Sequence, residues 1–222
     1  MDAIMQQFFN LDIMWQVLPL MLRGLAMTLG LCAVIIPLGT AGGLMIGILG
    51  TRPSVLVRGA VAVFVDVLRA IPPLVLLILL YSALPFAGVQ LSPFAAVVVA
   101  LTLNSSSFYG EIFRAGIDSV GQGQWQAARS TGLTVLQTLR HVIVPQAVRN
   151  VLPDLASNTL EVVKLTALAS VVSFQEILYA ADMARSVTYN ASPITMAAIL
   201  YLVLLWPLVR LVSRLERRVA TA

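Results

Sequence analysis

The sequence predicts an all-α membrane protein with five transmembrane helices, and three observations lead to this fold class. The 222 residues are 59% hydrophobic and only 11% charged, with a mean hydropathy of +0.92, and a soluble domain cannot bury that much apolar surface. Uncharged runs of membrane-spanning length separate the charged residues. The basic residues gather in alternate connections between those runs. We therefore expect a single transmembrane domain over 1–222, with no soluble domain.

Charged residues and one turn set the limits of the first spans. Between Arg23 and Arg52 lie 28 uncharged residues, enough to cross ~30 Å of hydrocarbon at ~1.5 Å per residue. The 41 uncharged residues between Arg69 and Glu111 are interrupted by LPFAGVQLSP at 84–93, whose prolines and glycine indicate a turn. Each half is too short to span alone, so both flanking helices are expected to include charged residues.

The remaining limits follow from this arrangement. We expect the second helix to begin near Val55 and the third to run from Pro93 past Glu111. Apolar stretches predict the fourth span over 152–178 and the fifth over 193–212. The longest connection then lies between the third and fourth spans, at 118–150.

The distribution of basic residues predicts the orientation, because cytoplasmic connections carry the excess of Lys and Arg. Three regions on one side hold most of them: Arg52, Arg58, Arg114, Arg129, Arg140, Arg149, Arg210, Arg214, Arg217 and Arg218. The other side holds Arg23 and Arg185 among acidic residues. We therefore expect the N-terminus outside, the C-terminus in the cytoplasm, and 118–150 as the largest cytoplasmic segment.

Within 118–150 the sequence predicts two short helices joined by a turn. A first helix over 123–130 is expected to end at Gly132, and Thr134 with Gln137 has the spacing of a capping box that starts a second helix. Pro145 is expected to kink this second helix or to turn it toward the membrane.

Small residues are expected to be exposed at the bend between these two helices, where they would allow another protein to pack closely against the backbone. Ala127 and Ala128 occupy that position, next to Arg129. The residues alone also allow an amphipathic helix that lies on anionic lipid headgroups. Composition does not decide between a protein partner and a lipid surface.

The motif QAARSTG, followed by nine residues and VIVP, resembles the EAA loop of ATP-binding-cassette importer permeases. That pattern reads Glu-Ala-Ala, three residues, Gly, nine residues, Ile-x-Leu-Pro. Ala127, Ala128, Gly132 and Pro145 are in register, while Gln126 replaces the glutamate.

Further segments resemble the polar amino-acid uptake branch of these permeases. They are RGLAMTLGL at 23–31, FVDVLRAIPPLVLLILLY at 64–81, FYGEIFRAGIDSVGQGQ at 108–124 and KLTALASVVSFQEIL at 164–178. Leu165 stands where many members have Asp, so cation preference cannot be inferred at that position. The resemblance covers about 16–218.

This resemblance implies a type I importer fold whose 118–150 segment docks into a groove on a separate ATPase subunit. The residues implied in this coupling are Gln126, Ala127, Ala128, Arg129, Gly132 and Leu133. Since Gln126 lacks the negative charge, docking there would rest on shape rather than on an ionic contact. The implied partners are two ATPase subunits, a second permease chain that is identical or similar, and a solute-binding protein outside a bacterial inner membrane. The implied substrates are polar amino acids, with opines or related derivatives as the alternative.

The chain itself lacks the motifs of ATP chemistry. No G-x-x-x-x-G-K-[ST] loop occurs, so we expect no cofactor here and ATP with Mg²⁺ on the partner ATPase. One Cys and one His exclude a cluster of such metal ligands. Gly39, Gly43 and Gly47 recur every four residues, a spacing that favours close helix packing in lipid rather than ligand binding.

Polar residues within the expected spans are candidates for a substrate path. Glu161 and Lys164 are three apart on one helix face, so they can pair with each other or meet the amine and carboxylate of an amino acid. The full set of path candidates is Asn158, Glu161, Lys164, Thr166 and Ser107. Ser107 belongs to a polar patch at 104–107, whose hydroxyls can equally bond back to their own helix.

A transporter or channel independent of ATP is the rival function. Secondary transporters usually contain inverted repeats, and none is visible in this sequence with an odd number of spans. A membrane enzyme has no catalytic constellation to support it. The basic C-terminal end is interpreted as a membrane-topology anchor, not as a nucleic-acid site.

Overall fold

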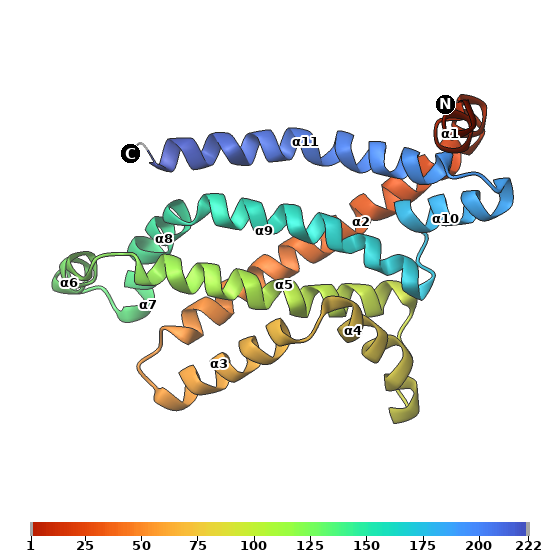
Figure 1. The fold of residues 1–222 in the computed structure, drawn as a ribbon. Helices are drawn as coiled ribbons and strands as arrows, with labels where there is room; N and C mark the ends of the chain where they lie inside the picture. Colours follow the sequence, from red (N-terminus) through yellow and green to blue (C-terminus); the bar gives the residue numbers. More distant parts are fainter. Residues whose placement is uncertain (1, 221–222) are drawn as a thin grey trace. The chain divides into compact units, whose positions relative to one another are not determined.

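The computed structural model describes the backbone of residues 2–220 and the side chains of residues 4–214, and every regular element in that range is helical (Figure 1). Arg217 and Arg218, assigned above to the cytoplasmic end, have side chains outside the described residues. The elements are α1 Asp2–Phe8, α2 Leu11–Gly50, α3 Val55–Ala70, α4 Pro73–Ile78, the π-helix η1 Leu79–Ala83, the 3-10 helix η2 Leu84–Ala87, α5 Pro93–Asp118, α6 Gln122–Ser130, α7 Val135–Thr138, the π-helix η3 Leu139–Ile143, α8 Val144–Asn150, α9 Leu152–Leu165, the 3-10 helix η4 Thr166–Val172, α10 Ile177–Thr188 and α11 Ser192–Ala220.

Four helical stretches are long and apolar enough to cross a membrane: Ile4–Gly50, Pro93–Asp118, Leu152–Val172 and Ser192–Arg214. A fifth crossing exists if Val55–Ala70 and Pro73–Ala87 are counted as one span, although the chain bends there by 96°. The helical membrane fold is therefore confirmed, whereas the number of crossings is four or five according to how this bent pair is counted.

The bend in the second expected span has a cause in two adjacent prolines. Ile71 adopts an extended backbone (φ −84°, ψ 123°), as a residue before proline prefers. Pro72 and Pro73 cannot donate backbone hydrogen bonds, so α3 cannot continue through them. The expected start near Val55 is confirmed, but the helix is interrupted at these prolines and α4 begins in a new direction.

Two other limits also differ from the expectations. The first helix begins at Leu11 rather than near Arg23, and Asn10 Oδ1 accepts a bond from Ile13 N (3.2 Å) at its start. The fourth span ends at Val172, six residues early, because Ser173 takes a left-handed backbone (φ 60°). Such a conformation closes a helix.

The chain divides into two compact units, each with its own buried cluster. Unit 1 comprises Met1–Ile35, Pro73–Leu101 and Leu160–Arg210, and unit 2 comprises Ile36–Pro72, Thr102–Thr159 and Leu211–Ala222. The two units are described separately below.

In unit 1 small residues bring α2 close to α10. Met21 of α2 is buried with Ile177, Ala181 and their neighbours on α10 and α11. A Cβ on Gly24 would lie 2.9 Å from the Glu176 carbonyl oxygen, so only glycine fits this contact. The start of α10 is therefore fixed on α2.

In unit 2 the glycines predicted to pack against another helix do so against α5. A Cβ on Gly39 or Gly43 would collide with Ser105 or Tyr109, and one on Gly47 would lie 2.7 Å from Phe113 Cβ. The close-packing interpretation of this glycine series is confirmed.

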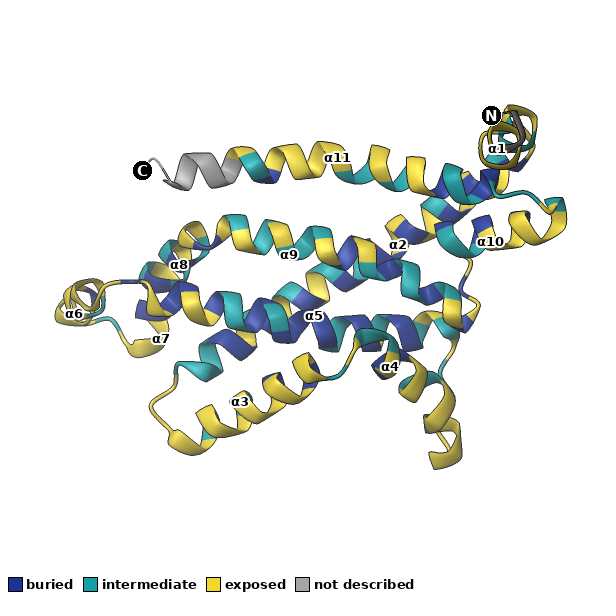
Figure 2. Cartoon of the chain, viewed as in Figure 1, coloured by how far each residue is buried: buried dark blue, intermediate teal, exposed yellow. Residues whose placement is uncertain are grey.

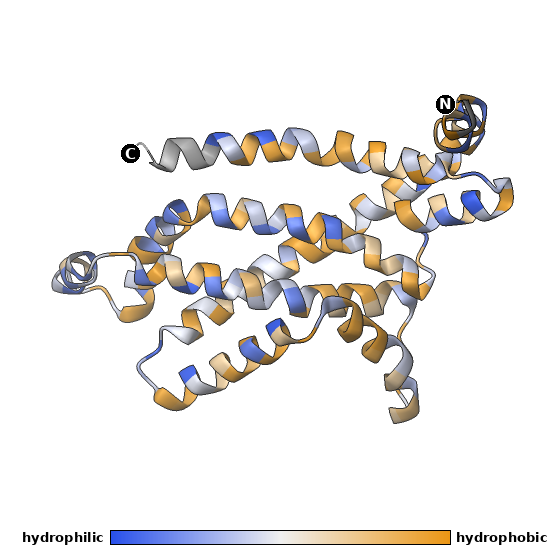
Figure 3. Ribbon diagram, in the orientation of Figure 1, coloured by the Kyte–Doolittle hydropathy of each residue, from blue (hydrophilic) through white to orange (hydrophobic). Residues whose placement is uncertain are grey.

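Burial and hydropathy separate the core helix from the outer one. The most apolar window of α5 is 61% buried and that of α11 is only 6% buried, as Figure 2 illustrates. The exposed residues of α11 include Leu202, Val203 and Trp206, and Figure 3 shows that this helix is largely hydrophobic before its polar end. Such a surface requires lipid or another apolar surface around it.

Candidate functional site

The candidate site is the α6–α8 segment of unit 2, which corresponds to the predicted coupling segment. Helix α6 ends at Ser130, and Gly132 follows with a left-handed backbone (φ 85°). Gly132 N donates to the Arg129 carbonyl (3.1 Å), and an Arg129 guanidinium N–H donates to the Leu133 carbonyl (2.7 Å). The turn is therefore closed from both sides of the glycine, as predicted for a helix stop.

The second helix starts with the predicted capping box. Gln137 N donates to Thr134 Oγ1 (3.3 Å), and Thr134 N donates to Gln137 Oε1 (2.8 Å). Both free amide groups at the helix start are thus satisfied.

Pro145, which was expected to kink this helix or to turn it toward the membrane, lies at the start of α8 and is preceded by a wider π-helical turn. Val144 N bonds to the Leu139 carbonyl instead of to the carbonyl four residues earlier. A proline ring clashes with the carbonyl four residues before it, and a π-turn relieves that clash. The segment then continues through α8 toward α9.

A buried cluster fixes the base of this segment on the end of α5. Ile117 of α5 and Val120, just after α5, pack with Leu139, Ile143 and Ala147, and Trp125 of α6 packs against the same cluster. Burial of this apolar surface stabilises the segment as a rigid element rather than as a free loop.

Side-chain hydrogen bonds add to this anchor. Asn150 Nδ2 donates to Ser119 Oγ (2.8 Å), and Ser119 Oγ in turn donates to the Gly116 carbonyl (2.7 Å). The end of α8 is thereby tied to the last turn of α5.

Most of the predicted coupling residues lie on the open side of this segment. Gln126, Ala127, Arg129 and Gly132 are exposed, and Leu133 is half-buried. Figure 3 shows that the ribbon of α6 is coloured mostly on the hydrophilic side of the scale.

Ala128 contradicts the expectation of an exposed small residue, because it is only 6% exposed. It lies three residues after Trp125 and therefore on the same face of α6, which turns toward the buried cluster. Of the two alanines, only Ala127 is available to a partner.

Sequence reasoning missed two apolar residues on the open side. Val135 is 51% exposed and Leu136 is 68% exposed. Burial in the second helix of this segment begins only at Thr138. Val135 and Leu136 directly follow the Thr134 cap and precede the helical turn that packs on the core. Their position next to the cap was therefore the available sequence signal.

The five substrate-path candidates fall into accessible and buried residues. Glu161 and Lys164 form an ion pair, and each side chain is 54% exposed, so their predicted pairing is confirmed. Asn158 is half-buried, and its Nδ2 has no hydrogen-bond partner among the described residues. This nitrogen is therefore a buried donor without a protein acceptor in the described part of the chain.

Thr166 and Ser107 are fully buried and bond to their own helices. Thr166 Oγ1 donates to the Val163 carbonyl and Ser107 Oγ to the Asn104 carbonyl, each at 2.7 Å. Neither hydroxyl faces an open surface of this chain. For Ser107 the structure favours the alternative in which the hydroxyl bonds back to its own helix.

A second charged group, in unit 2, joins α3 to α5. Glu111 accepts from Arg114 Nη2 (2.8 Å), as the spacing predicts, and Arg69 Nη1 lies 3.9 Å from the same carboxylate. The Arg69 guanidinium also lies 5.1 Å from the centre of the Phe108 ring. Arg69 is therefore close to both Glu111 and the Phe108 ring.

Glu176 in unit 1 is a buried acid that sequence reasoning did not select. Its carboxylate accepts from Leu178 N and Tyr179 N (both 2.8 Å) and from Tyr201 Oη (3.1 Å). Glu176 follows the fourth span and caps α10. Burial raises the pKa of Glu176, and its three hydrogen bonds oppose that rise. A Glu directly before an apolar run was the available sequence signal.

The geometry defines a class of protein, namely a helical membrane protein with a rigid helix–turn–helix segment outside its spans. Comparison with known proteins identifies the family. The model of the family "binding-protein-dependent transport system inner membrane component" matches residues 39–221, and the chain belongs to this family of transport permeases. The predicted family is thereby confirmed.

Known relatives are similar over most of their length. The glutamine transport system permease protein GlnP of Escherichia coli K12 is 33% identical over 217 residues, covering 95% of this chain and 97% of that protein. The probable glutamine ABC transporter permease protein GlnM of Bacillus subtilis is 41% identical over 156 residues, covering 70% and 72%.

Solved structures show the same architecture. A chain from the crystal structure of an amino acid ABC transporter with histidines superposes with a TM-score of 0.82 at 37% identity, covering 92% of this chain and 96% of that chain. A chain of the inward-facing MetNI methionine ABC transporter gives a TM-score of 0.77 at 23% identity, covering 94% and 98%. The second likeness is one of fold alone.

Proposed function

We propose that this chain is the membrane-spanning subunit of an ATP-binding-cassette importer for polar amino acids. The observation that carries the proposal is the nearly full-length likeness to permeases of glutamine transport systems and to an amino acid ABC transporter. The rival function, transport independent of ATP, has no support from this family. Which amino acid is carried is left to the experiment below.

In this proposal the α6–α8 segment docks on a separate ATPase subunit. Ala127 offers a small side chain beside the backbone, and Val135 and Leu136 offer apolar contact area. Gln126 and Arg129 are exposed beside them and complete the proposed contact surface with Gly132 and Leu133. Ala128 contributes by fixing the helix on its base. ATP and Mg²⁺ would be bound by the ATPase.

The rigid base of the segment is the physical reason why docking can move the membrane helices. Closure of two ATPase subunits would displace both docked segments, and each segment would carry the end of its α5 with it. Such a switch requires that ATP binding stabilise one membrane state more than the other. The working unit in this proposal contains a second permease chain, identical or similar, and an outer solute-binding protein. The C-terminus lies in the cytoplasm and the N-terminus outside a bacterial inner membrane.

The Glu161–Lys164 pair is the proposed substrate contact. An amino acid carries both charges of this pair, so its ammonium can take the place of Lys164 on Glu161 while its carboxylate meets Lys164. The partial exposure of both side chains supports this exchange. The proposed path also includes Asn158, whose buried Nδ2 lacks a protein acceptor among the described residues. Thr166 and Ser107 would act by shaping these helices.

Uptake into proteoliposomes tests the function directly. The purified complex would be reconstituted with ATP inside and the solute-binding protein outside, and a panel of labelled amino acids would be supplied. ATP-dependent accumulation of one group of amino acids is the expected result. Uptake by this chain alone, driven by an ion gradient, would instead establish the rival function.

A further inference from the structure

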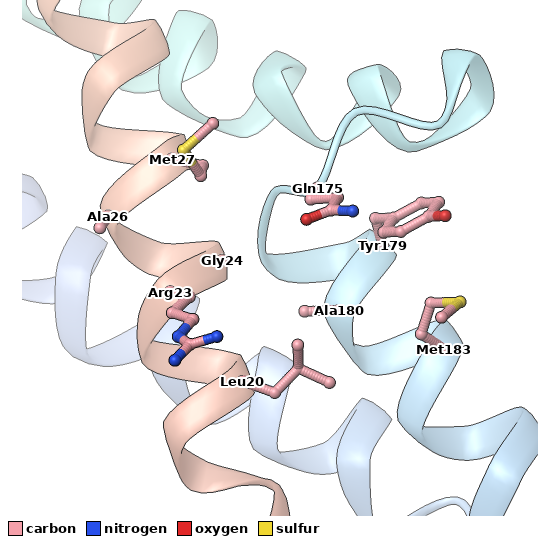
Figure 4. Close-up of a pocket in the computed structure, with 9 residues that line it drawn as sticks. All are labelled: Leu20, Arg23, Gly24, Ala26, Met27, Gln175, Tyr179, Ala180 and Met183. Atoms are coloured by element: carbon pink, nitrogen blue, oxygen red, sulfur yellow. The ribbon is translucent and has the colours of Figure 1, made fainter.

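A cavity of about 400 Å³ lies in unit 1 between α2 and α10 (Figure 4). Its volume falls within the ~300–1,000 Å³ that is usual for small-molecule sites. Leu20, Met27 and Met183 contribute apolar walls, and the polar atoms come from Arg23, Gln175 and Tyr179. The residues that line it include no acid.

The Arg23 guanidinium has no protein partner among the described residues. Neither a salt bridge nor a hydrogen bond of its side chain is present there, whereas Arg185 of the same unit pairs with Asp182 at 2.9 Å. A cation that lines an apolar cavity attracts an anion, because no carboxylate of the protein neutralises it.

The position of Arg23 along α2 places this cation at headgroup depth. The uncharged part of the helix from Gly24 to Gly50 is about 40 Å long at ~1.5 Å per residue, which exceeds the ~30 Å of the hydrocarbon core. Arg23 therefore lies beyond the hydrocarbon, where phosphate groups are found. Tyr179 on the opposite wall is a residue type enriched at that depth.

We propose that this cavity binds one phospholipid molecule, with its phosphate against Arg23 and an acyl chain along Leu20, Met27 and Met183. The cation and the apolar walls together fit this ligand class. The ammonium group of an amino acid would need an acidic side chain in the cavity, and none of the residues that line it is acidic. A free anion would gain no binding energy from the apolar methionine side chains. The bound lipid would join α2 to α10 directly beside the small-residue contact, since Gly24 and Ala180 also line the cavity. This inference does not depend on the proposed transport function.

The first test measures lipid affinity by native mass spectrometry. The chain, purified in detergent with the subunits that accompany it, would be titrated with phosphatidylglycerol. We expect Arg23→Gln to weaken the tightest binding step about fivefold, as expected for one cation near a lipid phosphate. Arg185→Gln is the matched control, because Asp182 already neutralises that guanidinium, and it should leave the step unchanged. Equal affinities of wild type and Arg23→Gln would overturn the proposal.

A second variant separates the cavity from the charge. Ala26 is exposed and lines the cavity, so Ala26→Phe should fill the cavity and abolish the step while Arg23 and the fold remain intact. Retention of the lipid by Ala26→Phe would overturn the proposed site.

Two further arms test other occupants. Inorganic phosphate at millimolar concentration should fail to displace the lipid, and displacement would reveal a simple anion site instead. The single cysteine of Ala26→Cys/Cys32→Ala should react with a lipid-soluble maleimide in the assembled protein. Protection of that thiol by a cross-linkable second chain would show that protein covers the cavity, and this result would also overturn the proposal.

Discussion

Replacing Gly132 with valine tests whether the turn between α6 and α7 transmits motion. Gly132 has a φ of 85°, and a Cβ added there would meet nothing within 4 Å. The whole effect of the substitution therefore comes from the backbone. A left-handed conformation costs a residue with a Cβ about 1–2 kcal/mol, and a β-branched residue is a genuine outlier there.

This cost is large enough to change the population of the turn. A difference of 1–2 kcal/mol shifts an equilibrium by about 5–30-fold, so a large fraction of the segments would lose the present angle between the two helices. The Arg129 bond to the Leu133 carbonyl spans the turn and would be strained or lost with it. The base of the segment, buried on α5, does not include Gly132, so membrane insertion should be unaffected.

The assay compares ATP hydrolysis with uptake in proteoliposomes of the assembled complex. For Gly132→Val we expect uptake to fall at least about fivefold while the ATPase subunits remain able to hydrolyse ATP. Gly132→Asn should retain more uptake, since Asn tolerates this backbone, and Gly132→Asp should lie between them. Gly123→Ala is the matched control, because Gly123 lies inside α6 in open space. Normal uptake by Gly132→Val would refute the reasoning.

Further predictions concern the two buried contacts and the ion pair. Gly43→Val places side-chain atoms against Tyr109 and should lower the free energy of unfolding by about 1–3 kcal/mol. Thermal unfolding in detergent measures this loss of stability. Gly30→Val is the control and should lower stability less, because a Cβ at Gly30 meets nothing within 4 Å. Glu176→Ala leaves two amide groups and a tyrosine hydroxyl without their acceptor and should cost about 2–4 kcal/mol, whereas an unchanged midpoint would show that water replaces the carboxylate. Lys164→Gln should raise the KM for amino acid uptake about tenfold or more if the pair binds substrate, and a variant with lower stability but unchanged KM would assign the pair a structural role.

The hydropathy pattern was sufficient to predict where most helices lie. Arg52 marks the end of the first apolar run, and the cost of burying charge in lipid makes such a limit reliable. Glu111, in contrast, lies inside α5. The same pattern could not predict the break at Ile71, because apolar composition is unchanged across it. The adjacent prolines were visible, but the direction of the chain after them depends on tertiary packing.

The candidate site was predicted well in its local geometry and less well in its burial. Gly132, Thr134 and Gln137 act through bonds to their immediate neighbours, so sequence spacing alone defines them. Ala128 and Leu136 differ, since their exposure depends on which side of a short helix meets the core. Glu176 was missed for a related reason, because its partner Tyr201 lies 25 residues away and no local spacing marks that contact.

The neutral Gln126 has a consequence for the compatibility of subunits between transporters in one cell. Between Asp118 and Asp154 the chain has no acid, and Arg129, Arg140 and Arg149 make this stretch cationic. On the proposed docking role, an ATPase whose groove presents a basic residue to the usual glutamate would find no counter-charge and would meet like charges nearby. Exchange of ATPase subunits with importers that keep the glutamate would thus be disfavoured. The substitution would help this permease to bind its own ATPase subunit rather than that of another importer.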